Sequence, residues 1–192
     1  KTKRCRKRHR RIKMPLTKIS QLSSIGNSGV TALTIDSSGR ILTPSRPAFR
    51  ARLDGPSSSA TGTNGTIVFN NEDFDIGGNY NTSDGLFTAP VTGVYQFMFR
   101  MLGATDSSGG ISGANDTIYA DFYKNGTANS NIVKGAREIH QQAGGNFYVS
   151  LGMTSLIQLS ASDNVRVIVG SEFAYADTTD AYDPCFEGFL IG

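Results

Sequence analysis

Three aspartates near the C-terminus have the residue type and spacing of a cation site. Asp177, Asp180 and Asp183 stand three residues apart in the sequence ADTTDAYD, within the segment 172–183. Calcium takes about six to eight oxygen ligands, and carboxylates, threonine hydroxyls and backbone carbonyls can supply several of them. Calcium is therefore the one cofactor that the sequence suggests. The alternative interpretation is an acidic loop that is simply solvated.

The remaining reactive side chains do not support catalysis. The two histidines, His9 and His140, stand in no motif that places a serine, cysteine or carboxylate beside them. The sequence contains no GxxxxGK[ST] phosphate-binding loop. Cys5 and Cys185 show neither CxxC nor HxxxH spacing, so they predict no zinc site, and Cys185 is interpreted as a small buried apolar residue. We expect a protein that is not an enzyme.

Positive charge is concentrated at the N-terminus. Residues 1–13 hold nine of the 19 lysines and arginines and no acid, whereas residues 14–192 hold ten basic and all 16 acidic residues, a formal charge of −6. This basic arm is either upstream sequence outside the native protein, with Met14 as the natural start, or a solvated disordered arm, or a contact for an anionic surface. Nucleic acid is not expected as a partner, because no aromatic residues interleave with the charges for base stacking.

Composition predicts an all-β protein without a membrane span. The chain has 22 glycines, 11 phenylalanines and no tryptophan, and it is rich in serine, threonine and asparagine. Such a composition suits short strands separated by many turns. No apolar run approaches the roughly 18 to 20 residues that a membrane-spanning helix requires. The basic start is followed by polar sequence, so no secretory signal is expected either.

A polar segment, residues 14–46, separates the basic arm from the rest of the chain. Within it, apolar residues at 30–35 lead into Asp36-Ser37-Ser38-Gly39, and Ile41 and Leu42 follow, which predicts a β-hairpin. A lone hairpin of this size is marginal in water, so identical chains are its expected partners. The sequence GVTALTIDSSGRILTP also resembles short β segments in the shafts of bacteriophage tail fibres. We call residues 14–46 the stalk segment.

From residue 47 to the C-terminus the sequence predicts strand after strand. Alternation is clearest at 93–102, where Tyr95, Phe97 and Phe99 are expected to face a core. Val94 and Met98 lie on the opposite face, which is apolar enough to suit a subunit interface better than free solvent. About 145 residues of this pattern indicate a jelly-roll β-sandwich. The predicted strands are 48–53, 66–69, 93–102, 117–124, 131–140, 146–159, 165–170 and 185–191.

Aromatic and glycine anchors at fixed spacing link this region to a known family. The sequence FNNEDFDIGGNYNTSDGLFTAPVTGVYQFMF, beginning at Phe69, is followed by FYKNG at 122–126, by Leu159 with Asp163 and Val165, and by FEGFL at 186–190. These motifs resemble the C1q globular-head family over roughly residues 47–192, and Ser162 stands where that family usually has glycine. The residues predicted to define the core of the fold are Phe69, Tyr80, Phe87, Gly93, Tyr95, Phe97, Phe99, Phe122, Phe186, Gly188 and Phe189.

The resemblance implies a C1q/TNF-like head that forms a homotrimer at the end of a stalk and binds ligands through its outer loops. Many members have a collagen stalk, but this chain has no Gly-X-Y repeat, so the hairpin would take that place. Together with the resemblance of GVTALTIDSSGRILTP to tail-fibre shaft segments, this absence favours a virion appendage such as a phage tail fibre. Its expected partners are a host cell-surface protein or glycan and, through the N-terminal segment, other virion proteins.

Two other functions stay open at this point. The chain could be a structural capsid decoration or adaptor, whose head only holds three chains together, or a secreted C1q-like protein that binds a ligand as a lectin does. Predicted loops at 54–65, 103–116 and 172–183 favour binding, because exposed Ser, Gly, Asn and Asp loops on a rigid sandwich are where binding sites usually lie.

Overall fold

The computed structural model describes residues 33–54, 65–105, 116–140, 147–169, 175–176 and 184–192. The chain divides into two compact units, Lys1–Ser45 and Arg46–Gly192. We call the second unit the head. None of the described residues forms a helix long and apolar enough to cross a bilayer.

The first unit contains the β-hairpin expected from the sequence. Strands β1 (Thr34–Ile35) and β2 (Ile41–Leu42) are antiparallel, and Ile35 pairs with Ile41. The Asp36 carboxylate shapes the turn, because its Oδ1 accepts hydrogen bonds from the backbone N–H groups of Ser38 at 2.8 Å and Arg40 at 3.0 Å. These bonds and the Arg40 guanidinium lower the pKa of Asp36. Gly39, with φ of 79°, occupies the left-handed position that the turn requires.

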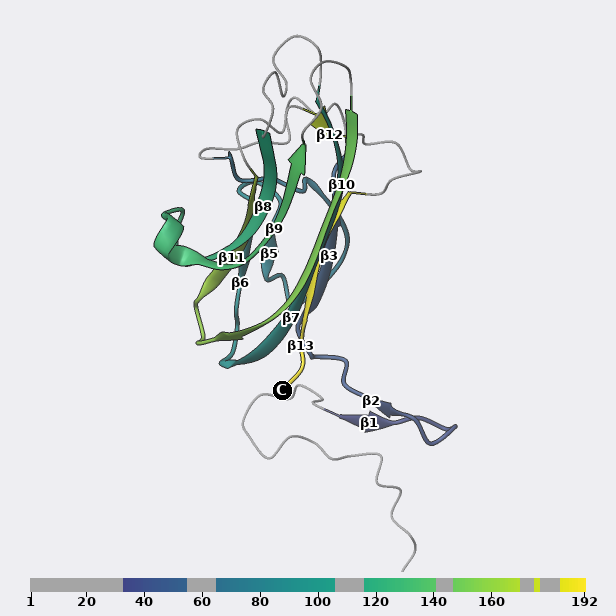
Figure 1. The fold of residues 1–192 in the computed structure, drawn as a ribbon. Helices are drawn as coiled ribbons and strands as arrows, with labels where there is room; N and C mark the ends of the chain where they lie inside the picture. Colours follow the sequence, from purple (N-terminus) through teal and green to yellow (C-terminus); the bar gives the residue numbers. More distant parts are fainter. Residues whose placement is uncertain (1–32, 55–64, 106–115, 141–146, 170–174, 177–183) are drawn as a thin grey trace, which may run out of the picture. The chain divides into compact units, whose positions relative to one another are not determined.

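The head is an all-β sandwich of two antiparallel sheets, as predicted (Figure 1). Its described residues include the short 3₁₀ turn Asn129–Asn131 and no α-helix. The six-stranded sheet has the order β10 (Phe147–Leu159), β7 (Gly93–Thr105), β13 (Cys185–Leu190), β3 (Ala48–Arg52) and β4 (Asn71–Ile76), and β12 (Tyr175–Ala176) also pairs with β7. The five-stranded sheet has the order β5 (Tyr80–Asn81), β6 (Leu86–Thr88), β11 (Asn164–Val169), β8 (Asp116–Lys124) and β9 (Ile132–His140).

The predicted strand at 66–69 is wrong. Thr66 and Ile67 form isolated β-bridges and no strand: Thr66 bridges to Ile168, and the N–H of Ile67 donates to the carbonyl of Val167 at 3.0 Å. The chain then turns away into β4, which the sequence analysis missed together with β5 and β6. These strands are short or, in β4, rich in acidic side chains, so they lack the apolar alternation that marks a strand.

Stacked and edge-to-face aromatic rings fill the space between the sheets. Phe186 lies at the centre of this core, fully buried, and its ring centroid lies 5.0 Å from that of Phe49 and 5.8 Å from those of Phe97 and Phe122. Such ring pairs add stability beyond the area that they bury. The predicted core rings that the structure places in the interior are Phe69, Tyr80, Phe87, Tyr95, Phe97, Phe99, Phe122 and Phe186.

Phe189 does not belong to this core, which corrects the prediction. Its side chain is 38% exposed. Side chains alternate across a strand, so Phe186 and Gly188 share the inner face of β13 and Phe189 lies on the other. Gly188 is required for close packing, because a Cβ there would lie 2.6 Å from the ring of Phe97. At Gly93 a Cβ would lie 2.6 Å from Leu190 Cδ1 and 3.0 Å from the carbonyl oxygen of Gly192, so glycine permits a close backbone approach there.

Tyr80 combines ring packing with two buried hydrogen bonds. Its ring stacks on Phe49 at 5.0 Å, and its hydroxyl donates to the Phe69 carbonyl and accepts from the Phe69 N–H, both at 3.1 Å. Burial raises the pKa of Tyr80 well above its ordinary range. The hydroxyl thereby satisfies both backbone groups of a residue that has no strand partner.

We predict that Tyr80→Phe lowers the free energy of unfolding by about 1–3 kcal/mol, because the Phe69 N–H and carbonyl lose their partner inside the core. Urea denaturation of the purified chain measures this loss. Tyr95→Phe is the matched control, since its hydroxyl makes one bond, to the Val91 carbonyl at 2.7 Å. A loss for Tyr80→Phe no larger than that for Tyr95→Phe would contradict the prediction.

Candidate functional site

The predicted calcium ligands Asp177, Asp180 and Asp183 lie outside the described residues. Within the described part of the chain, no three His, Cys, Asp or Glu side chains gather as a metal site. The calcium site therefore stays a prediction.

The residues weighed for catalysis are only partly described by the structure. His9 lies outside the described residues, and His140 ends β9 at the edge of the five-stranded sheet. Cys185 is a free thiol with 1% exposure, as interpreted from the sequence, and burial raises the pKa of that thiol.

The most distinctive surface of the described head is the outer face of the six-stranded sheet, meaning the side turned away from the core. Along β7, Tyr95, Phe97 and Phe99 are buried, and the intervening Val94 and Met98 are only partly buried. This alternation confirms the predicted orientation of the strand. The pairing of β7 with β10 and β13 extends the same two faces across the sheet.

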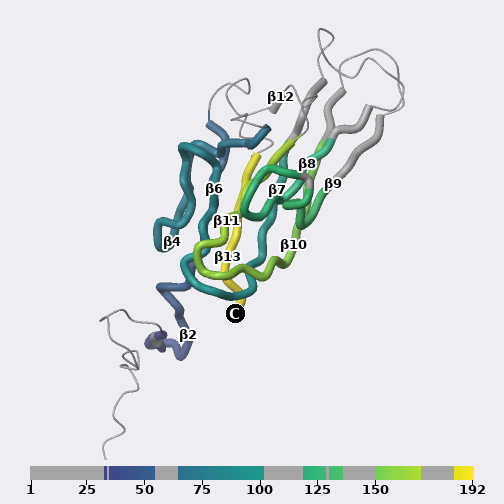
Figure 2. Tube along the Cα trace, turned by 90° about the vertical axis from the view of Figure 1, so that its left-hand side faces the viewer, coloured from purple at the N-terminus to yellow at the C-terminus, as the bar shows by residue number. Residues whose placement is uncertain are grey.

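Two rows of residues cross this outer face from strand to strand, running over β10, β7, β13, β3 and β4 in turn. The traces of β10, β7, β13 and β4 are labelled in Figure 2. The first row, in register, is Leu156, Gln96, Phe189, Ala48 and Ile76. The second row is Thr154, Met98, Glu187, Arg50 and Phe74.

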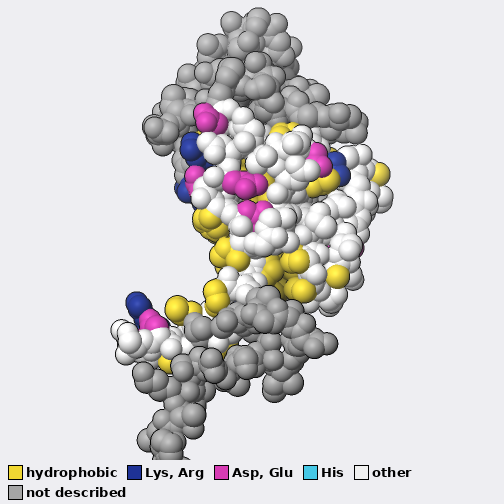
Figure 3. Space-filling model, turned by 180° about the vertical axis from the view of Figure 1, so that it is seen from behind, with side chains coloured by type: hydrophobic (Ala, Val, Ile, Leu, Met, Phe, Trp, Pro, Cys, Tyr) yellow, Lys and Arg dark blue, Asp and Glu magenta, His cyan; other side chains and the backbone are white. Residues whose placement is uncertain are grey.

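Large apolar side chains in these rows reach solvent. Leu156 is 62% exposed, Phe74 48% and Ile76 40%, and Ile191, just beyond β13, is 40% exposed. Isolated exposed apolar residues are ordinary, but several on one sheet face indicate an interaction surface. Hydrophobic and charged side chains are seen next to one another on the described surface in Figure 3.

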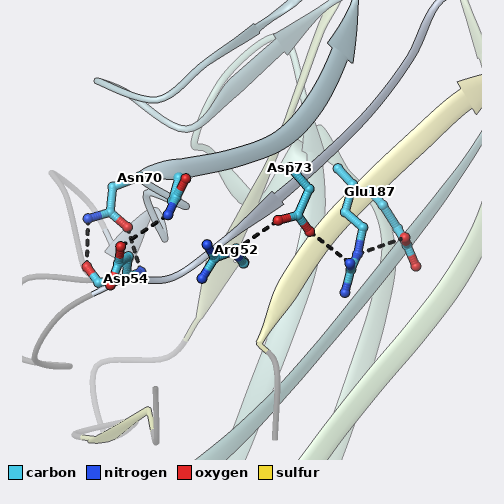
Figure 4. A network of polar contacts seen from close by, with 7 residues as sticks. Arg52, Asp54, Asn70, Asp73 and Glu187 are labelled. Atoms are coloured by element: carbon cyan, nitrogen blue, oxygen red, sulfur yellow. Dashed lines mark hydrogen bonds and ion pairs between the residues drawn. The ribbon is translucent and has the colours of Figure 1, made fainter. Parts of the chain in front are cut away.

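A compact group of charges stands among these apolar residues (Figure 4). Asp73 on β4 lies between two arginines of β3: its Oδ2 accepts from Arg50 Nη1 at 2.7 Å and its Oδ1 from Arg52 Nε at 2.9 Å. Glu187 Oε2 on β13 lies 3.5 Å from Arg50 Nε. We call these four residues the charge cluster. Each side chain keeps 27–36% of its exposure.

A β-bulge places Asp73 in the cluster. The register of β3 against β4 shifts between Arg50 and Ala51, so Arg50 pairs with Phe74 while Ala51 pairs with Glu72. Asp73 is the extra residue, and a bulge of this kind redirects a side chain. With strict alternation, the neighbour of the outward Phe74 would point to the other face of the sheet.

A second group of polar side chains links the turn that follows β8 to the turn between β10 and β11. The Asp163 carboxylate accepts from Asn125 Nδ2 at 2.6 Å and from the Ser160 N–H at 2.7 Å, and Lys124 Nζ lies 2.8 Å from it. The bonds from Lys124 and then Asn125 lower the pKa of Asp163 to about 2. Ser162 has φ of 72°, so it adopts the left-handed conformation for which the C1q pattern uses glycine.

This arrangement predicts an acid-sensitive contribution to stability. Since the pKa of Asp163 lies below its ordinary value of 3.8, its contribution is fully present above that pH and is lost as the pH falls toward about 2. We expect the melting temperature of Asp163→Asn to be lower than that of the wild type at pH 6. As the pH falls through this window, the melting temperature of the wild type should fall more steeply than that of Asp163→Asn. Thermal unfolding followed by circular dichroism from pH 6 to pH 2 measures both. Parallel curves would argue against this role.

The two ends of the head differ in which segments of the chain lie there. Gly192 and Pro47 lie at one end, where Val94 N–H donates to the Gly192 carbonyl at 2.7 Å and Leu190 N–H to that of Pro47 at 3.0 Å. At the other end Thr105 pairs with Phe147, and Asp116 pairs with His140. The connections 106–115 and 141–146 therefore leave from the end opposite the chain's entry, which we call the distal end (Figure 1).

Comparison with known proteins agrees with this architecture. The family model of the C1q domain matches residues 48–191. The chain belongs to the C1q domain family. The globular domain of zebrafish complement 1qA protein superimposes with a TM-score of 0.51 at 21% identity, covering 77% of this chain and 98% of that one, and it shows the same fold. A search of curated proteins gave no match. C1q domains are a non-enzymatic fold that typically forms trimers and binds ligands.

The sequence analysis found only part of this surface. It assigned Val94 and Met98 to an interface face, but it overlooked Leu156 and Phe74. Strict alternation along 146–159 could have placed Leu156 outward, because Ile157 and Leu159 continue the inner series. No local pattern signals the contact of Asp73 with β3, since 21 residues separate Asp73 from Arg52.

Proposed function

We propose that this protein is a homotrimeric binding head that associates through the outer face of the six-stranded sheet. The observation that supports this most is the row of exposed apolar side chains on a domain whose family typically trimerises. Burying apolar surface is the main favourable term in protein association, and about 25 cal/mol per Å² removed from water is a reasonable scale. One chain alone leaves this face in water.

The stalk segment supports a display role. Its hairpin leaves Ile35 41%, Ile41 67% and Leu42 44% exposed, although a two-stranded hairpin of this size is marginal alone. Three chains associating here would cover these side chains. The sequence GVTALTIDSSGRILTP in the same segment resembles tail-fibre shaft segments. This resemblance favours a virion appendage, such as a tail fibre, as the structure to which the head belongs. Its N-terminal segment would then contact other virion proteins.

Ligand recognition is proposed for the distal end. The described strands converge there on the connections 106–115 and 141–146, which are rich in serine, glycine and asparagine or glutamine, while the chain enters and leaves at the opposite end. Loops held by a rigid sandwich are a common place for binding sites. A host cell-surface protein or glycan is the proposed ligand. Asp177, Asp180 and Asp183 are the proposed calcium ligands.

The test is binding to host cells by the purified, fluorescently labelled chain. The proposal expects saturable binding that excess unlabelled chain competes away. Absence of binding to host cells, and to their isolated surface proteins and glycans, would reject the receptor-binding function.

A structural function is the second candidate, because the exposed sheet face and hairpin serve association whether or not a ligand binds. As a capsid decoration or adaptor, the protein would be dispensable for host adsorption. Deleting its gene separates the two: loss of adsorption supports receptor binding, whereas intact adsorption with less stable particles supports the structural function. A secreted C1q-like protein would instead be recovered outside the producing cell, free of particles.

A further inference from the structure

We propose that Asn125 is a deamidation site that its contact with Asp163 holds unreactive, and that conversion of Asn125 breaks the link between the two turns that these residues join. The inference concerns a slow covalent change within one chain, so it does not depend on the proposed function.

The reactive pair is Asn125-Gly126, in the turn that follows β8. In deamidation the backbone nitrogen of Gly126 attacks Cγ of Asn125, so that an N–Cγ bond forms and the Cγ–Nδ2 bond breaks. Nδ2 leaves as ammonia with the proton that the attacking nitrogen loses. Water then opens the succinimide ring: its hydroxyl adds to one ring carbonyl carbon and its other hydrogen goes to the ring nitrogen. An aspartate or isoaspartate remains at position 125.

The shape of the turn favours both members of this pair. Asn125 has φ of 56°, a left-handed conformation that asparagine adopts more readily than most residues. A Cβ at position 126 would lie 2.8 Å from Asn131 Oδ1, so a larger residue there would have to displace that side chain. Glycine also leaves its backbone nitrogen unhindered, because it has no side chain. The fold therefore retains a sequence that is chemically reactive.

Hydrogen bonds, and not burial, protect Asn125. The residue is exposed, so water reaches it. Its Nδ2, the atom that would leave, donates to the Asp163 carboxylate at 2.6 Å, and its Oδ1 accepts from the Asn164 N–H at 2.8 Å. The Asn125 N–H also donates to the Asn164 carbonyl at 3.0 Å. An amide held at both polar atoms by another turn cannot rotate freely to close on the nitrogen of Gly126.

Asp163 is itself held in place as a charged acceptor. Its carboxylate accepts from the Ser160 N–H at 2.7 Å, and Lys124 Nζ lies 2.8 Å from it. Because the bonds from Lys124 and Asn125 lower the pKa of Asp163 to about 2, the carboxylate is ionised at neutral pH. Its bond to Asn125 is therefore charge-assisted, and such bonds are stronger than those between neutral groups.

Conversion of Asn125 turns this attraction into repulsion. The new carboxylate would have no N–H to donate and would face Asp163 at the position where Nδ2 lies now. Like charges at this distance disfavour one another. The isoaspartate product also lengthens the backbone of the turn by one carbon. The link between the turns that follow β8 and β10 would be lost in either product.

The test follows conversion at position 125 by peptide mapping with mass spectrometry while the full chain is kept in mildly alkaline buffer. Mapping separates this position from the other Asn-Gly pair, Asn64-Gly65. A synthetic peptide of residues 120–130, which lacks Asp163, gives the unprotected rate. The wild type is expected to convert about tenfold more slowly or less, a factor within reach of hydrogen bonds to a charged group. Asp163→Ala should approach the rate of the peptide.

Asp84→Ala is the matched control, because Asp84 Oδ2 likewise accepts from an asparagine, Asn81 Nδ2, at 3.1 Å in another turn. It should leave the rate at position 125 unchanged. Circular dichroism verifies that each variant is folded. Conversion of the wild type as fast as the peptide would overturn the inference without any variant, and so would equal rates for Asp163→Ala and the wild type.

Asn125→Asp tests the consequence of the modification, since it introduces the charge of the product. It is expected to lower the midpoint of urea denaturation below that of Ala128→Asp, which adds the same charge to an exposed residue of the same turn. Equal midpoints for the two variants would contradict the predicted loss of the link between the turns.

Discussion

Phe186→Ala is expected to lower the free energy of unfolding by about 3–5 kcal/mol, the range for removing a large ring from a packed core. Phe186 is fully buried and its ring contacts those of Phe49, Phe97 and Phe122, so its loss leaves a cavity that the two sheets cannot close. Because a domain of this size has only about 5–15 kcal/mol of stability, a large part of the head's stability should disappear. Urea denaturation of the purified chain measures the change.

Phe189→Ala is the internal control for that experiment. It removes the same side chain from the same strand, three residues later, but from the outer face, where Phe189 is 38% exposed. The stability of the isolated monomer should change by less than about 1 kcal/mol, as for most exposed positions. Similar losses for the two variants would contradict the assignment of the two faces of β13.

Phe189→Asp is expected to abolish self-association at micromolar concentration while leaving the monomer folded. The change puts a charge in the middle of the apolar row, beside Gln96 and Ala48, where a covering copy would have to desolvate it without a partner. Loss of a central contact together with burial of an unpaired charge is among the most damaging changes to an interface. Mass photometry and sedimentation velocity measure the oligomer.

Ala128→Asp is the control for added charge, since Ala128 is exposed in the turn after β8 of the other sheet. This variant should associate as the wild type does. If Phe189→Asp also associates as the wild type does, the outer face of the six-stranded sheet is not the contact surface.

Strand periodicity explains why much of the head could be predicted. Tyr95, Phe97 and Phe99 alternate without interruption in a strand whose register continues into both neighbours, so local pattern and tertiary structure agree. The same rule, applied to FEGFL, places Phe186 inward and Phe189 outward. Treating both rings as core overlooked that an odd spacing puts two residues on opposite faces.

The charge cluster could not be predicted in the same way. Period two places Arg50 and Arg52 on one face, but their partners come from distant strands, and the bulge at Asp73 breaks the alternation of β4. That strand consists of Asn71–Ile76, whose acidic residues gave no apolar pattern. Long-range pairing and a local irregularity together determine this part of the surface, and neither is encoded in a short window of sequence.

The most direct test of the proposed function is the mass of the purified 192-residue chain by sedimentation equilibrium at micromolar concentration. A trimeric head that associates through its exposed sheet face predicts three times the chain mass of 20.5 kDa. A single species of 20.5 kDa across the whole concentration range would contradict it.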